Sequence, residues 1–160
     1  MTTFDKARLQ RYGIGILRVV LGIIFAAHGA QKLFQFGLSG TAGAFGQMGI
    51  PLPTLSAAVV MAAELFGGLA LVFGLFTRLA AVPLAVTMLV AMLAVHRPGG
   101  FFLPEGVEYT LALLSANVAL VLTGPGAWAL DNVLRGSGSA TLGRASERAE
   151  AERGGLRPAA

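Results

Sequence analysis

Four long runs of apolar residues, separated by short polar or turn-rich stretches, set the pattern of this chain. They cover residues 14–36, 55–76, 79–95 and 107–123. A helix that spans a membrane needs about 20 mainly apolar residues, and the third run is shorter and contains Pro83. The pattern predicts an all-α protein, an antiparallel bundle of four transmembrane helices.

The stretches between the runs predict how the helices are connected. Residues 37–53 are uncharged and rich in Gly and Pro, which indicates an extracytoplasmic loop with a short interfacial helix near residues 43–48. Only Thr77 and Arg78 separate the second run from the third, so these two runs are expected to form a tight hairpin. Residues 96–106 are rich in turn-forming residues and connect the last two runs.

The chain divides into three parts on this interpretation. Residues 1–12 form an N-terminal cytoplasmic segment, residues 13–134 the four-helix membrane domain, and residues 135–160 a cytoplasmic tail. The tail mixes charges of both signs with Gly, Ser and Ala. It has too few large apolar residues to offset the entropy lost on ordering, which predicts a disordered tail.

Composition and charge support a location in the lipid bilayer. Hydrophobic residues make up 55% of the chain and charged residues 12%, about half the charged share of a soluble domain. The net charge is +4, but the basic residues do not form one face, which argues against binding to nucleic acid. Most lie on one side of the predicted domain, at Lys6, Arg8, Arg11, Arg78, Arg135 and Arg144, against Lys32 and Arg97 on the other. The positive-inside rule then predicts that both termini are cytoplasmic.

The chain contains no cysteine. Disulfides, thiolate nucleophiles, iron–sulfur clusters and cysteine-ligated zinc are therefore excluded within this chain. Redox chemistry would need a bound cofactor or a partner subunit.

Polar residues in the first run share a face with small residues. The small residues recur every seven positions, at Gly15, Gly22 and Gly29. Small residues let helices approach closely in lipid. At about 100° per residue, Arg18, His28 and Lys32 lie within roughly 140° of this stripe. These polar side chains are therefore expected to point into the bundle, and not toward lipid.

Depth in the membrane predicts a central group of charges. An ionisable side chain at mid-bilayer costs ~3 kcal/mol or more, so it usually has a partner or a function. At about 1.5 Å per residue from the outer helix ends, Glu64 lies ~15 Å deep, His28 ~10 Å and Arg18 ~25 Å. We therefore expect these three side chains to form one central network.

A second group of charges is expected near the outer surface. Lys32 is level with Glu105 and Glu108, which predicts that it pairs with one of them. Tyr109 and Trp128 are typical interfacial anchors. In the fourth run, a polar residue in an apolar helix predicts a hydrogen bond to another helix; this residue is Asn117.

Three interpretations of the buried polar residues remain open. They could be structural pairs that fix the order of the helices, or they could form a site for a small ligand such as a quinone headgroup. The weaker alternative is axial ligation of haem by His28 and His96, which are both expected toward the outer leaflet. The candidates for a buried polar or ligand site are Arg18, His28, Gln31, Lys32 and Glu64, and those of the outer layer are His96, Glu105, Glu108 and Tyr109.

The order of these features resembles the DoxX family of small bacterial membrane proteins. The resemblance rests on Arg18 with Leu21 and Gly22, HGAQKL (28–33), GIPLP (49–53), Glu64 with Gly67, Gly68 and Gly74, Thr77 and Arg78, His96, Glu108 with Tyr109, and GPGAWALD (124–131). It covers roughly residues 11–134. One departure is Ala129, where the family commonly has serine before Leu–Asp.

The resemblance implies a four-helix protein of the bacterial cytoplasmic (inner) membrane, with His28, Gln31 and Lys32 at motif positions. Some members are similar to a subunit of thiosulfate:quinone oxidoreductase, and others are associated with a membrane complex that contains a superoxide dismutase and a sulfurtransferase-like protein. Many carry only an oxidoreductase label.

Two functions follow as hypotheses. The first is a membrane subunit of a redox or oxidative-stress complex that touches quinone through His28, Arg18 and Glu64. The alternative is a non-enzymatic membrane scaffold or small-solute carrier. The sequence leaves the catalytic residues, the cofactor, the protein partner and homo-oligomerisation open, and no metal site is predicted.

Overall fold

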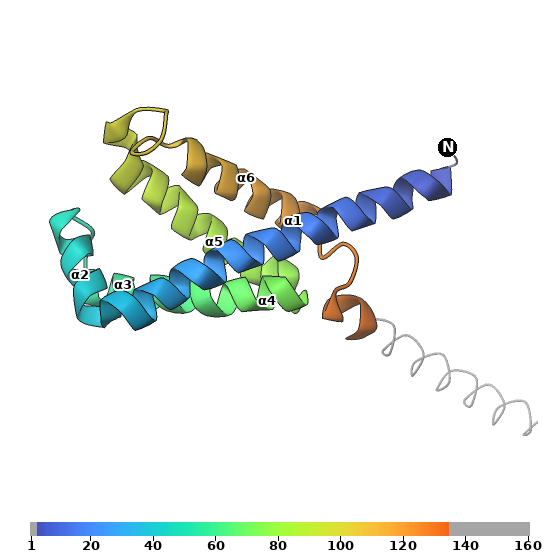
Figure 1. The fold of residues 1–160 in the computed structure, drawn as a ribbon, viewed down its shortest axis with the longest axis horizontal. Helices are drawn as coiled ribbons and strands as arrows, with labels where there is room; N and C mark the ends of the chain where they lie inside the picture. The colour runs from blue at the N-terminus through green and yellow to red at the C-terminus, as the bar shows by residue number, and fades with distance from the viewer. Residues whose placement is uncertain (1–2, 135–160) are drawn as a thin grey trace, which may run out of the picture.

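The computed structural model describes residues 3–134 of the chain, and these residues are almost entirely helical, without a strand (Figure 1). The predicted all-α class is therefore confirmed. The predicted tail at residues 135–160 lies outside the described residues.

Helical elements follow one another along residues 3–134, and three of them are single π-helical turns, which hold one residue more than an α-helical turn. The elements are α1 (Thr3–Gln31), η1 (Lys32–Phe36), α2 (Gly37–Gln47), α3 (Pro53–Ala62), η2 (Ala63–Gly67), α4 (Gly68–Phe73), α5 (Thr77–Ala91), η3 (Met92–His96), η4 (Arg97–Gly99) and α6 (Glu108–Thr123). The π turns are η1, η2 and η3, and η4 is a short 3₁₀ helix.

Three continuous helices in the described part of the chain are long and apolar enough to cross a membrane. They run over Phe4–Gln47, Pro53–Phe73 and Thr77–Gly99. The fourth apolar helix, α6, lies where the sequence predicts it but has only 16 residues, which corresponds to about 24 Å. The connection after the first run is also more helical than expected, because α2 covers Gly37–Gln47 in place of the short helix predicted near residues 43–48.

The helices pack as two pairs. Helix α1 lies along η2 and α4, and α5 lies along α6. In Figure 1 the two pairs meet near the α4–α5 connection and spread apart toward α2 and η3. We call these the narrow end and the wide end of the molecule.

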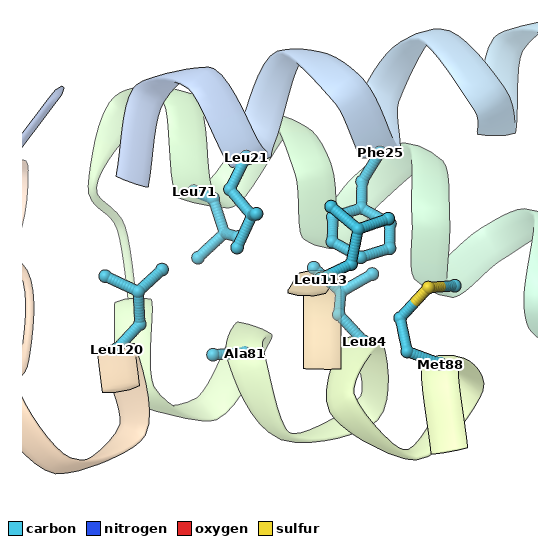
Figure 2. Packing of buried hydrophobic residues seen from close by; sticks show 8 residues of the cluster. All are labelled: Leu21, Phe25, Leu71, Ala81, Leu84, Met88, Leu113 and Leu120. Atoms are coloured by element: carbon cyan, nitrogen blue, oxygen red, sulfur yellow. The ribbon is translucent and has the colours of Figure 1, made fainter. Parts of the chain in front are cut away.

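The core lies between the two pairs and takes side chains from all four helices (Figure 2). Its buried residues are Leu21 and Phe25 of α1, Leu71 of α4, Ala81, Leu84 and Met88 of α5, and Leu113 and Leu120 of α6. Many other apolar side chains are exposed on the outer faces of the helices, as expected where lipid, and not water, surrounds a bundle.

Glycines bring α1 against η2 and α4, as the small-residue stripe predicts. A Cβ atom added at Gly29 would lie 2.4 Å from the backbone nitrogen of Leu65, and one at Gly22 would lie 2.7 Å from the carbonyl oxygen of Gly68. A Cβ added at Gly68 would lie 2.4 Å from the nitrogen of Ala26. The two backbones are therefore in direct contact, and this part of the prediction is confirmed.

The segment after α6 folds back and caps α5. The Asp131 carboxylate accepts hydrogen bonds from the backbone N–H groups of Phe76 (2.7 Å) and Thr77 (2.9 Å). These donors lie at the start of α5, where no preceding helical turn supplies an acceptor. The Asp131 N–H in turn donates to the Gly74 carbonyl at 2.9 Å. Asp131, the last residue of the GPGAWALD stretch, therefore has a structural role as the cap of α5.

Candidate functional site

A cavity of about 800 Å³ lies at the wide end, between the α1–η2 side and the α5–α6 pair. Most of its lining is apolar and comes from α1, α3, α5 and α6. Its polar lining residues are His28, Lys32, Ser56, Glu64, Thr87, His96, Tyr109 and Thr110. An apolar cavity with a few polar groups is the usual form of a small-molecule site.

An ion pair forms part of the cavity wall. The Lys32 ammonium donates to the Glu64 carboxylate at 2.5 Å. The Glu64 side chain is only 4% exposed and that of Lys32 is 20% exposed. The charge of Glu64 is thus compensated by a residue that the sequence placed near the outer surface.

The predicted pairing of Lys32 with Glu105 or Glu108 is therefore wrong. Gly29 packs directly against the backbone of Glu64 and Leu65, and Lys32 lies about one helical turn after Gly29. The long lysine side chain reaches back over that turn to Glu64. Glu108 accepts a hydrogen bond from the Leu103 N–H at 2.7 Å instead, and Glu105 is exposed.

The predicted central network of Arg18, His28 and Glu64 is also wrong. Arg18 is fully buried, but within the described residues the hydrogen bonds of its guanidinium group go to backbone carbonyls. The acceptors are the carbonyl oxygens of Pro125 (2.8 Å), Val72 (2.9 Å), Ala127 (3.1 Å), Trp128 (3.2 Å) and Leu71. Arg18 therefore joins α1, the end of α4 and the segment after α6 at the narrow end, away from the lining of the cavity.

The two histidines do line one cavity. The Nδ1 atom of His28 lies 2.9 Å from the carbonyl oxygen of Ile24, and that of His96 lies 3.1 Å from the carbonyl oxygen of Glu105. A carbonyl oxygen only accepts, so Nδ1 carries the proton in both rings. In the neutral form of each ring, Nε2 is then the hydrogen-bond acceptor that is left for a ligand.

Each π-helical turn supplies one ionisable residue to this cavity. Lys32 begins η1, Glu64 lies in η2, and His96 ends η3. π turns often occur at functional sites, because the extra residue changes the direction of the side chains around it. Sequence reasoning missed these turns, since a single inserted residue leaves no mark in a continuous apolar run.

The remaining predicted residues are placed as follows. Gln31 is exposed and lies outside the cavity lining, whereas Tyr109 contributes to it. The predicted interhelical bond of Asn117 is wrong, because its amide donates to the Leu113 carbonyl of the same helix at 2.8 Å. Within residues 3–134, no group of three or more His, Asp or Glu side chains could hold a metal ion.

The family comparison settles which proteins this chain resembles. The DoxX family profile matches residues 13–97. The chain belongs to the DoxX family. The matched DoxX region contains Lys32, Glu64 and His96, the three ionisable residues of the π turns.

Several curated bacterial proteins are similar to this DoxX protein over most of their length. "Putative oxidoreductase CatD" of Bacillus subtilis is 41% identical over 74% of this chain and 84% of its own. An uncharacterized protein of Haemophilus influenzae is 39% identical over 82% and 96%, respectively. Inner membrane protein YqjF of Escherichia coli is 29% identical over 79% and 95%. No solved structure matches. This DoxX chain is thus a membrane protein with apolar helices.

Proposed function

We propose that this protein is the membrane subunit of a redox complex and that its wide-end cavity binds a quinone. The observation that carries the proposal is the Lys32–Glu64 ion pair in the wall of a mainly apolar cavity of about 800 Å³. A buried ion pair inside a membrane usually marks a functional site. The oxidoreductase name of one relative supports the same reading.

The chemistry of the cavity suits a quinone and its reduced form. A quinone ring is apolar and presents carbonyl oxygens, to which the Lys32 ammonium can donate. A quinol presents hydroxyl groups, for which the Nε2 atoms of His28 and His96 are acceptors. The chain has no cysteine, so we assign the delivery of electrons to a partner subunit and the binding of the quinone to this chain.

We further propose that the chain crosses the membrane four times, with α6 as the short fourth span, α2 at the outer interface and both termini in the cytoplasm. The excess of Lys and Arg at the narrow end supports this orientation. A reporter active only outside the cytoplasm is therefore expected to be silent when it is fused to either end. An active fusion at either end would reverse the orientation.

Binding of a short-chain quinone to the protein in lipid nanodiscs tests the site. We expect Glu64→Gln to destabilise the bundle, because Lys32 then loses its counter-charge. The double variant Lys32→Met, Glu64→Gln removes both charges and is expected to recover most of the thermal stability. Its quinone affinity, measured by titration calorimetry, is expected to stay at least tenfold below that of the wild type.

The matched control is Arg97→Gln, which removes an exposed charge at the same end without touching the cavity lining. This variant is expected to bind quinone like the wild type. If the double variant is stable and also binds quinone normally, the ion pair is structural and the quinone proposal fails. That result would favour the scaffold hypothesis.

A further inference from the structure

A second pocket lies at the narrow end, far from the cavity proposed to bind quinone. It has a volume of about 440 Å³ and lies between the first turns of α1 and the segment after α6. Its lining combines two basic side chains, Arg8 and Arg11, with three aromatic ones, Phe4, Tyr12 and Trp128. None of these residues takes part in the proposed quinone site.

The aromatic and basic groups of this pocket are in contact. The rings of Tyr12 and Trp128 have centroids 5.0 Å apart. The guanidinium carbon of Arg8 lies 5.7 Å from the centre of the Tyr12 ring, and its Nε donates to the Tyr12 hydroxyl at 3.2 Å. Tyr12, which itself packs against Trp128, therefore orients Arg8, and within residues 3–134 the other guanidinium donors of Arg8 are available to bind an anion.

Hydrogen bonds hold the segment after α6, which forms one wall of this pocket, in place beside α1. The Ala127 N–H donates to the Arg11 carbonyl at 2.9 Å. The buried Arg18 binds the carbonyl oxygens of Ala127 and Trp128. Trp128 adopts a φ of 53°, which is uncommon for a residue other than glycine. The fold thus fixes the indole ring against α1 at a cost in backbone conformation.

A strip of exposed apolar side chains leads from this pocket along α1. At about 100° per residue, Ile16 and Ile23 lie within roughly 80° of the helix face that carries Arg8 and Tyr12. They are 56% and 55% exposed. Tyr and Trp favour the level of the lipid headgroups, so the pocket lies at the interface and the strip lies in the hydrocarbon.

We infer that the Arg8–Trp128 pocket binds the headgroup of an anionic glycerophospholipid, with its acyl chains along the Ile16–Ile23 strip. The phosphate would bind between Arg8 and Arg11, because guanidinium groups recognise phosphate by paired hydrogen bonds. A zwitterionic lipid is expected to bind more weakly, because its ammonium group would come close to two arginines. A soluble phosphate would leave the apolar strip unused.

Native mass spectrometry of the delipidated, full-length protein in detergent tests this inference. Phosphatidylglycerol, phosphatidylcholine and inorganic phosphate are titrated separately. We expect phosphatidylglycerol to bind at least tenfold more tightly than phosphatidylcholine, and inorganic phosphate not to displace it. The double variant Arg8→Gln, Arg11→Gln is expected to lose this preference.

Two further variants separate recognition from general charge and from folding. Lys6→Gln removes an exposed charge outside the pocket lining and is expected to keep the preference. The double variant Arg8→Lys, Arg11→Lys keeps both charges and is expected to retain a weaker preference for phosphatidylglycerol. Equal binding of the two lipids by the wild type, displacement by inorganic phosphate, or an equal loss in Lys6→Gln would each overturn the inference. The outcome does not depend on quinone binding.

Discussion

Substituting Arg18 with methionine is expected to lower the free energy of unfolding by at least ~3 kcal/mol. Methionine keeps an unbranched apolar stem but ends at the position of the arginine Nε and donates no hydrogen bond, so the carbonyl oxygens of Pro125, Ala127 and Trp128 lose their common donor. Leaving a buried polar group unsatisfied costs about 1–3 kcal/mol, and Arg18 binds several carbonyl groups from two segments of the chain, the end of α4 and the segment after α6.

Thermal unfolding of the purified protein in detergent measures this effect. Arg18→Lys is expected to recover only part of the stability, because an ammonium group cannot reproduce the planar fork of a guanidinium. The control is Arg78→Gln, since Arg78 is exposed and, among the described residues, its side chain donates one hydrogen bond, of 3.2 Å, to the Leu122 carbonyl. If Arg18→Met unfolds at the wild-type temperature, the hydrogen bonds between Arg18 and the backbone carbonyls do not hold the fold.

Alanine at Gly29 or Gly68 is expected to destabilise the protein by about 1–3 kcal/mol, the usual cost of overpacking. The added Cβ atom would lie 2.4 Å from backbone nitrogen in each case, from Leu65 and Ala26 respectively. Backbone cannot rotate out of the way like a side chain. Helix α1 must therefore move away from η2 in Gly29→Ala and from α4 in Gly68→Ala, although alanine favours a helix more than glycine does.

The matched control is on the same helix. A Cβ added at Gly13 meets nothing within 4 Å, so Gly13→Ala is expected to unfold at or above the wild-type temperature. Loss of stability in Gly13→Ala equal to that in Gly29→Ala would show that close packing is not the reason for the glycine stripe.

The extents of the apolar helices and the close contact of α1 with η2 and α4 could be predicted from the sequence. Both depend on patterns that a single helix carries by itself, namely apolar length and the seven-residue spacing of Gly15, Gly22 and Gly29. The contacts of these glycines with neighbouring segments follow that pattern. The helical class of the described residues follows for the same reason.

The partners of the charged residues could not be predicted in the same way. Depth counted along ideal helices put Lys32 at the level of Glu108, but the register of α1 against η2 brings it to Glu64. Three π turns also shift the register, and no residue type announces them. Arg18 was assigned a side-chain partner, whereas its acceptors are backbone carbonyls, which are present at every position and therefore leave no signal.

Because Arg18 binds carbonyl groups near the end of the domain, its hydrogen bonds to them can form only late in the synthesis of the protein. Its acceptor in Pro125 lies 107 residues further along the chain, and a ribosome adding about 5–20 residues per second needs roughly 5–20 s to reach it. During that interval the first helix must enter the bilayer with a guanidinium group that still lacks some of its hydrogen-bond acceptors. The nascent chain is therefore most exposed to proteolytic quality control before its last segment is made. Truncation after α6 would leave it permanently in that state.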